Sequence, residues 1–198
     1  MDKTKRAERS WVLYDMGTSA YSVVISTAIF PIYFRSVATN AGVNSADATA
    51  FFSYAVSIAT FILAMLGPIL GTIADYRGMK KKFFTFFTGI GIISTVGLLF
   101  VPDDHWLLLV SLYVLTSVGA SGAGLFYNAF LVDVTKESRF NEVSSRGYAI
   151  GYIGSVIPFI VCIAIIMLAS NGTIPISTGT ASKISFLITA IWWLAFTI

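Results

Sequence analysis

Six long runs without an ionised side chain divide this sequence. Charged residues make up only 12% of the chain, about half the share that a soluble domain carries. An α-helix rises about 1.5 Å per residue, so about 20 residues cross the roughly 30 Å of hydrocarbon in a bilayer. Five runs reach that length, and the sixth has 15 residues. The chain is therefore predicted to be an all-α membrane protein with six transmembrane helices. The runs are 16–34, 48–74, 83–102, 105–132, 147–182 and 184–198.

The helix boundaries follow from these runs and from the charges beside them. A soluble helical protein would show a polar outer face on each helix, but the segments 83–87 and 191–194 are apolar on every side. This argues against the soluble all-α class. We expect the sixth helix to be truncated. The predicted helices cover about residues 10–34, 49–74, 82–101, 106–132, 147–168 and 184–198.

The basic residues alternate between the two ends of the predicted helices. Cytoplasmic loops of membrane proteins collect Lys and Arg. The N-terminal segment, the second-to-third connection and the fourth-to-fifth connection hold eleven of them, and the other connections hold only Arg35 and Lys183. We therefore expect a multi-pass protein of the cell membrane, or of the vacuolar membrane in a fungus, with its N-terminus in the cytoplasm. The eleven are Lys3, Lys5, Arg6, Arg9, Arg77, Lys80, Lys81, Lys82, Lys136, Arg139 and Arg146.

The first predicted helix carries a polar stripe. Asp15, Ser19, Ser22 and Ser26 follow one another at helical spacing and share one narrow face of a regular α-helix. A carboxylate facing lipid is costly, so the stripe is expected to line a cavity or a protein contact. The alternative is a carboxylate near the headgroups, held by backbone or by a neighbouring base. Both readings remain open at this point.

The fourth and fifth predicted helices add polar side chains at membrane depth. Tyr113, Ser117 and Asn128 lie close together on a helical wheel, and Tyr127 adjoins them. The run of small residues at 119–124 favours close helix packing. These positions complete a candidate cavity for substrate or coupling ion. Its members are Asp15, Ser19, Ser22, Ser26, Tyr113, Ser117, Tyr127, Asn128 and Tyr152.

A signature motif follows the second predicted helix. Residues 71–80 read G-T-I-A-D-Y-R-G-M-K, which resembles the G-x-x-x-D-x-x-G-x-[KR] loop of the major facilitator superfamily. Gly71, Asp75, Gly78 and Lys80 match it, while Tyr76 and Met79 stand where that loop usually has bases. Gly71 permits another helix to approach, and Gly78 permits a tight turn.

Three further segments are similar to one branch of this superfamily. Residues 11–21, 126–133 and 144–152 resemble the first, fourth and fifth helices of the vacuole effluxers, which are related to fungal autophagy proteins. Here residues 16–18 read Met-Gly-Thr, where that branch would have Trp-Ala-Asn. The resemblance implies twelve helices in two six-helix halves, each made of two three-helix repeats, and alternating access. It also implies a cytoplasmic gate cluster of Asp75, Lys80 and Asp133, and it associates fungal relatives with amino-acid efflux.

Two hypotheses for function follow. The first is a secondary active transporter of small solutes, with amino acids as the suggested class and proton coupling through Asp15. This chain would be its N-terminal half and would need a C-terminal half or a second copy. The alternative is a half-transporter that does not transport and acts as an oligomeric binding or assembly module. The expected partners are the lipid bilayer, the missing half and a small-molecule substrate.

Catalysis and nucleic-acid binding are not expected. The chain has one Cys and one His, and it contains none of the usual hydrolase or metalloprotease motifs. We therefore predict no enzyme activity, no catalytic residue, no metal ligand, no cofactor and no nucleic-acid partner.

Overall fold

A computed structural model describes residues 3–76 and 78–197, except for the side chains of Lys3 and Asp75. The described residues form helices joined by short turns, with no strand among them, so the prediction of an all-α protein is confirmed. Six helical spans are long and apolar enough to cross a membrane by length and composition. They are Thr4–Asn40, Ser45–Ala74, Met79–Phe100, Trp106–Val134, Glu137–Ser170 and Thr178–Thr197.

The first span is not a regular α-helix. The α-helix α1 (Lys3–Ala20) passes into a π-helix, η1 (Tyr21–Ile29), and then into α2 (Phe30–Asn40). The amide of Phe30 donates to the carbonyl of Ile25, five residues back. Pro31 follows directly and has no N–H for the carbonyl of Thr27, which its ring also crowds. The wider π turns accommodate this proline without breaking the span.

The remaining spans are single long helices or a helix with a short extension. The turn between α3 and α4 contains Gly78 at φ +82°, a left-handed conformation that favours glycine. The elements are α3 (Ser45–Asp75), α4 (Met79–Gly97), η2 (Leu98–Phe100), α5 (Trp106–Ala129), α6 (Leu131–Val134), η3 (Glu137–Arg139), α7 (Phe140–Ser170) and α8 (Thr178–Thr197).

Three helices begin six or seven residues before their predicted starts. The structure begins α1 at Lys3, α7 at Phe140 and α8 at Thr178, whereas the sequence placed these starts near residues 10, 147 and 184. The predicted starts followed the charged residues. A helix can continue through a charged turn when its side chains reach water or a partner, so charge marks the edge of the apolar region rather than the end of the helix.

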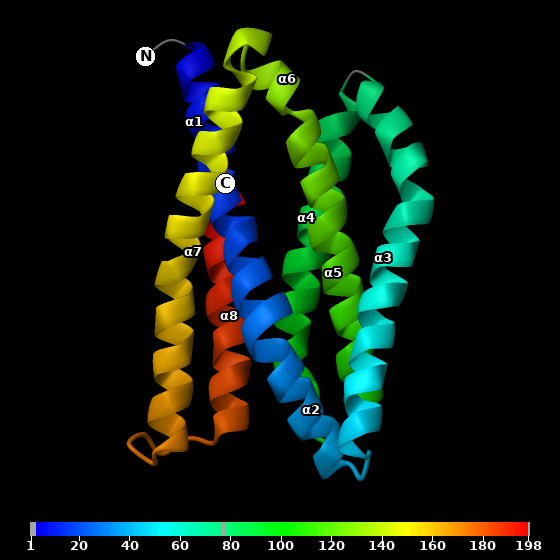
Figure 1. The fold of residues 1–198 in the computed structure, drawn as a ribbon, viewed down its shortest axis with the longest axis vertical. Coiled ribbons are helices and arrows are strands. Elements are labelled where there is room, and N and C mark those ends of the chain that lie inside the picture. The colour runs from blue at the N-terminus through cyan, green and yellow to red at the C-terminus, as the bar shows by residue number, and fades with distance from the viewer. Residues whose placement is uncertain (1–2, 77, 198) are drawn as a thin grey trace.

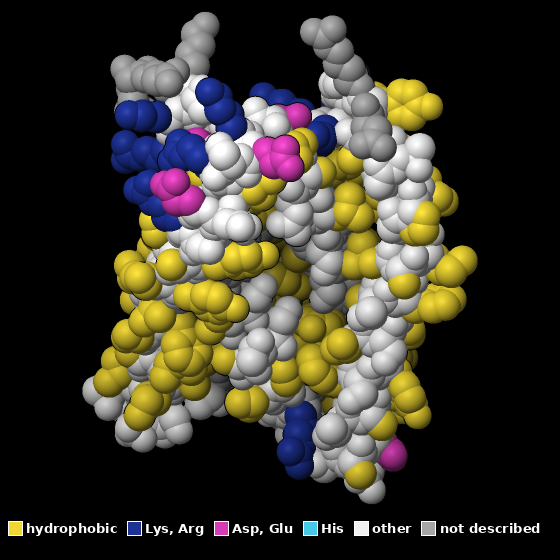
Figure 2. All heavy atoms as spheres, turned by 45° about the horizontal axis from the view of Figure 1, so that its top comes forward, with side chains coloured by type: hydrophobic (Ala, Val, Ile, Leu, Met, Phe, Trp, Pro, Cys, Tyr) yellow, Lys and Arg dark blue, Asp and Glu magenta, His cyan; other side chains and the backbone are white. Residues whose placement is uncertain are grey.

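The helices form two groups joined by the first span (Figure 1). α1, α7 and α8 lie on one side, and α3, α4 and α5 lie on the other, while η1 and α2 cross from the first group toward α3. The start of α1, the turn at Gly78 and the α6–η3 segment share one end, which we call the basic end. Figure 2 shows Lys and Arg side chains gathered at this end and hydrophobic side chains along the flanks.

Small residues let the helices approach closely. In α4 and α5, Gly119 lies against the backbone of Gly91, and the buried hydroxyl of Thr116 donates to the Gly91 carbonyl at 3.0 Å. The Thr95 hydroxyl lies 2.6 Å from that of Thr116 and also bonds the Gly91 carbonyl, at 2.8 Å. Because backbone contact and hydrogen bonds coincide here, α4 and α5 are held at a fixed separation.

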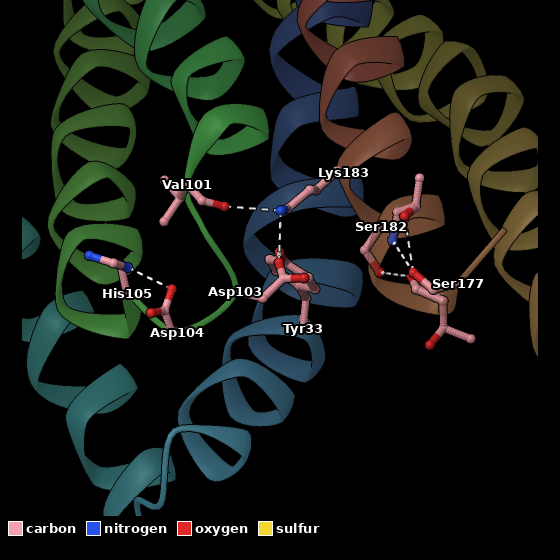
Figure 3. Close-up of polar contacts among 10 residues, drawn as sticks. Tyr33, Val101, Asp103, Asp104, His105, Ser177, Ser182 and Lys183 are labelled. Carbon is pink, nitrogen blue, oxygen red and sulfur yellow. Dashed lines mark hydrogen bonds and ion pairs between the residues drawn. The ribbon is translucent and has the colours of Figure 1, made fainter.

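A polar cluster ties three spans together at the end opposite the basic end (Figure 3). The Lys183 ammonium lies 2.7 Å from the Asp103 carboxylate and donates to the Val101 carbonyl at 2.9 Å. The Tyr33 hydroxyl donates to the same carboxylate at 3.1 Å. The hydrogen bond from Lys183 lowers the pKa of Asp103 below its ordinary value. One loop carboxylate therefore links α2 to α8.

Candidate functional site

A cavity of about 470 Å³ lies between the first span, α3 and α5. This volume is within the range of small-molecule sites. Hydroxyl, phenol and amide groups line it together with apolar side chains from α3. Its lining residues are Asp15, Thr18, Tyr21, Ser22, Ser26, Phe52, Val56, Ala59, Thr60, Leu63, Tyr113, Ser117, Ala120, Ser121, Gly124, Tyr127, Asn128 and Tyr148.

Seven of the nine candidate cavity residues line this cavity. They are Asp15, Ser22, Ser26, Tyr113, Ser117, Tyr127 and Asn128. The other two, Ser19 and Tyr152, line a smaller cavity of about 220 Å³. The two cavities share Asp15, Thr18, Ser22 and Tyr148. The structure thus brings all nine residues to two adjoining cavities.

Asp15 lies at the junction of the two cavities. Its side chain is only 7% exposed, and its carboxylate rests against Gly151 of α7, where a larger residue would leave no room. The Ser19 hydroxyl makes a long contact of 3.5 Å with Oδ2. Among the described side chains, no Lys, Arg or His nitrogen lies within 4 Å of this carboxylate. In the part of the chain that the structure describes, Asp15 is therefore a buried acid without a counter-ion.

Glu8, two turns earlier on α1, is the contrasting case. It is 8% exposed, and its carboxylate accepts hydrogen bonds from Arg139 at 2.7 and 2.9 Å and from Thr135 at 2.6 Å. A buried charge is tolerated when it is paired and hydrogen-bonded. The same helix thus carries one compensated and one uncompensated buried carboxylate.

Aromatic packing fixes the wall on the α5 side. The indole of Trp11 stacks on Tyr127 with ring centroids 4.4 Å apart and donates to the Tyr127 carbonyl at 2.9 Å. The hydroxyl of Tyr21 lies 3.3 Å from that of Ser117, which joins η1 to α5. The buried hydroxyl of Tyr127 has no hydrogen-bond partner. These contacts hold the first span and α5 in register on both sides of the cavity.

Sequence reasoning missed two groups of lining residues. Tyr21 falls outside the stripe expected for a regular α-helix and begins the π-helix η1, which turns the chain differently, whereas Thr18 lies beside the stripe in the α-helical part of the span. The α3 wall of Phe52, Val56 and Thr60 follows a four-residue spacing. That spacing was visible in the sequence, but a mostly apolar face on a membrane helix could equally have faced lipid.

The motif residues lie at the basic end. The Lys80 ammonium is 2.6 Å from the Asp133 carboxylate and donates to the Ala129 carbonyl at 2.9 Å. The side chain of Asp75 lies outside the described part of the structure. A side chain built at Gly71 would meet no atom of the described residues within 4 Å, so none of the described helices approaches it closely. Lys80 and Asp133 therefore join the α4 end to α6.

No metal cluster accompanies these residues. Across the described ranges, no group of three His, Cys, Asp or Glu side chains could hold a metal ion. The chemistry available at the cavity is therefore that of one carboxylate, several hydroxyls and phenols, and one amide.

Comparison with known proteins identifies relatives. The profile of the family described as vacuole effluxer Atg22 like matches residues 3–138 and 132–198. An MFS-type transporter of Bacillus subtilis (strain 168), YxiO, described as uncharacterized, is 57% identical over 198 residues, which are 100% of this chain and 46% of that protein. Autophagy-related protein 22 of Coccidioides immitis (strain RS) is 23% identical over 249 aligned positions, which cover 100% of this chain and 40% of that protein.

A third relative aligns with a smaller part of this chain. An uncharacterized protein of Aquifex aeolicus (strain VF5) is 28% identical over 155 residues, which are 76% of this chain and 36% of that protein. The chain thus spans less than half the length of these curated relatives. No solved structure matches it.

Proposed function

The chain belongs to the vacuole effluxer Atg22-like family, and from that membership we propose that it forms the N-terminal half of a secondary active transporter that moves small solutes by alternating access. The sequence resembles that of a major facilitator transporter. The family match and the Bacillus relative confirm this resemblance. Amino acids are the substrate class that we propose, because the resemblance to the vacuole effluxers associates fungal relatives with amino-acid efflux.

The cavity at Asp15 is the observation that carries this proposal. In an apolar bundle, an ionisable side chain at membrane depth is expensive and usually belongs to a substrate or ion pathway. Here that side chain borders two adjoining cavities lined by hydroxyls and phenols. Rocking transporters bind substrate near the membrane midplane between two structural repeats. A second six-helix half, or a second copy of this chain, would close the open side of the cavity.

Proton coupling through Asp15 follows from its lack of a counter-ion. A buried carboxylate without a cation is more stable when it carries a proton. Protonation on one side of the membrane and release on the other would let a proton gradient bias the direction of transport.

Lys80 and Asp133 would act at the gate, where their ion pair forms or breaks as the basic end closes or opens. With this gate, the basic end of the bundle faces the cytoplasm.

Transport by the complete gene product in proteoliposomes tests the proposal. Leucine uptake should depend on an imposed pH gradient, and Asp15→Asn should abolish that dependence while the protein stays folded. Asp47→Asn is the matched control, because Asp47 is exposed in the first turn of α3. If transport by the Asp15→Asn variant still depends on pH, Asp15 takes no part in proton coupling.

The oligomeric module remains the second candidate, because broad apolar faces of α3 and α7 are uncovered in this chain. Phe61 and Met65 on α3 and Ile153 on α7 are each more than 60% exposed. Lipid could cover these faces, and so could another copy. Crosslinking in native membranes separates the cases: a stable symmetric oligomer without solute flux would favour the module over the transporter.

A further inference from the structure

A pocket of about 400 Å³ lies between α1 and the η3–α7 segment near the basic end, and we call it the basic pocket. Four basic and two acidic side chains line it, so its lining carries a surplus of two positive charges at neutral pH. None of its described lining residues also lines the two cavities at Asp15. Its charged residues are Lys5, Glu8, Arg9, Arg139, Glu142 and Arg146.

Both acids of the basic pocket are hydrogen-bonded to one base. The Arg139 guanidinium donates to the buried Glu8 carboxylate at 2.7 and 2.9 Å and to the Glu142 carboxylate at 3.0 and 3.2 Å. Glu142 also attracts Arg146 at longer range. The positive surplus therefore rests on the three remaining bases, all of which are exposed. They are Lys5, Arg9 and Arg146.

Apolar side chains line the deeper part of the pocket. α1 and α7 both run inward from the basic end (Figure 1), so higher residue numbers on either helix lie deeper. Val12 and Leu13 follow the bases of α1, and Ile150 follows those of α7. A phospholipid at the edge of a bilayer has the same order of groups, since its charged headgroup lies outside its acyl chains.

Exposed aliphatic side chains continue from the pocket along α7, and we call them the aliphatic track. Ile153, Ile157 and Ile160 follow Ile150 by three, seven and ten residues, so all four lie on one side of the helix. The first three are each more than half exposed. Ten residues of α-helix rise about 15 Å, which is about half of the roughly 30 Å of hydrocarbon in a bilayer. The track therefore matches the length of an acyl chain in one leaflet.

We propose that the basic pocket binds the phosphate of an anionic phospholipid, with one acyl chain along the aliphatic track. Arg9 on α1 and Arg146 on α7 contact the phosphate, because guanidinium groups form strong paired hydrogen bonds with phosphate oxygens. Arg139 is a positioning residue, since it keeps both acids of the pocket hydrogen-bonded. One lipid thus joins the first span to the fifth. The inference goes beyond the proposed transport function and does not depend on it.

The probe is a phosphatidylglycerol that carries a photoreactive diazirine on one acyl chain. The complete gene product is placed in phosphatidylcholine nanodiscs that contain a small share of this probe, irradiated and digested, and the labelled peptides are mapped by mass spectrometry. Adducts are expected on α7 between Ile150 and Val161. A phosphatidylcholine with the same diazirine chain should label this segment far less, because its headgroup has no net charge.

A pair of double variants tests the charges. Each base near an anionic headgroup contributes about fivefold to lipid affinity, so Arg9→Gln with Arg146→Gln should weaken phosphatidylglycerol binding about 25-fold. Lys81→Gln with Lys82→Gln is the matched control, because it removes two exposed positive charges from the start of α4 at the same end. The control should keep the labelling of α7. Equal unfolding temperatures in pure phosphatidylcholine show that both variants are folded.

Four results would overturn the proposal. The two probes label α7 equally, or the control loses labelling as fully as the Arg9 and Arg146 variant, so that the pocket has no selectivity of its own. The unaltered protein gives no adduct between residues 150 and 161, so that protein rather than lipid covers the track. Millimolar inorganic phosphate displaces the probe, so that the pocket takes a soluble anion. These comparisons of the two probes on the unaltered protein decide the question even if a variant fails to fold.

Discussion

The contact between α4 and α5 makes a sharp prediction about stability. In Gly119→Ala, the new Cβ would lie 2.6 Å from the Cα of Gly91 and 2.9 Å from the carbonyl oxygen of Phe87. The Gly91 nitrogen would lie closer still, and ordinary contact begins at 3.4 Å, so the two backbones must separate by about 1 Å. That shift also lengthens the 3.0 Å hydrogen bond from Thr116 to the Gly91 carbonyl. The atoms struck are all backbone, so no side-chain rotation relieves the clash.

A matched control lies on the same helix. A Cβ at Gly124 would meet no described atom within 4 Å, and replacing glycine by alanine in a helix gains up to about 1 kcal/mol. Overpacking costs typically about 1–3 kcal/mol. We therefore expect Gly119→Ala to lower the free energy of unfolding by about 1–3 kcal/mol, and Gly124→Ala to leave it unchanged or raise it by up to about 1 kcal/mol.

The assay uses the buried thiol of Cys162. Heating the purified protein with a fluorogenic maleimide gives an unfolding temperature, since the thiol reacts only when α7 and α8 separate. A gap of about 1–4 kcal/mol between the variants corresponds to roughly 2–16 °C on the scale of soluble domains of this size. Equal unfolding temperatures for Gly119→Ala and Gly124→Ala would refute the close approach of α4 and α5.

Three further predictions concern single polar contacts. Arg139→Met should lower the free energy of unfolding by about 1–3 kcal/mol, because it leaves the buried Glu8 carboxylate without its cation. Adding Glu8→Gln should recover part of the loss in the same thermal assay. The ion pair with Lys183 lowers the pKa of Asp103; its stabilisation is therefore present above the ordinary pKa and is lost as pH falls through the lowered one. Asp103→Asn should remove that acid dependence from a pH series of unfolding temperatures. Thr88→Val should leave stability unchanged or raise it by up to about 1 kcal/mol, because the buried Thr88 hydroxyl has no partner; a clear loss would reveal a hydrogen bond there.

The sequence predicts the number and class of the helices well, because hydrocarbon imposes a length and a composition on each span. It predicts their starts less well. Lys183 marked a boundary in the sequence, yet it lies one and a half turns inside α8, where its ammonium reaches Asp103 and the Val101 carbonyl. A charge with partners can sit inside a helix, and those partners come from distant parts of the chain.

The residues of the candidate site were also predicted only in part. Asp15 and Ser22 stood out because polar residues are rare in an apolar helix, and both line the cavity. Tyr21 did not, since a regular α-helix was assumed where the structure has η1, and Thr18 did not, because it lies beside the stripe rather than on it. Val56 on the α3 wall carries no local signal, because the same residue type covers lipid-facing helices. Which apolar face turns inward depends on tertiary packing that one sequence does not encode locally.

If the proposed transport function is right, the polar stripe of the first span faces a water-accessible cavity. In a Cys162→Ala background, single cysteines at Ser22 and Asn128 should react in membranes with a charged methanethiosulfonate, because thiols ionise and react in water. Cysteines at Ile93 and Ile191 should stay unreactive; both native side chains are more than 55% exposed on the flanks of the bundle and should meet lipid. Unreactive cysteines at Ser22 and Asn128, with reactive ones at Ile93 and Ile191, would contradict the account.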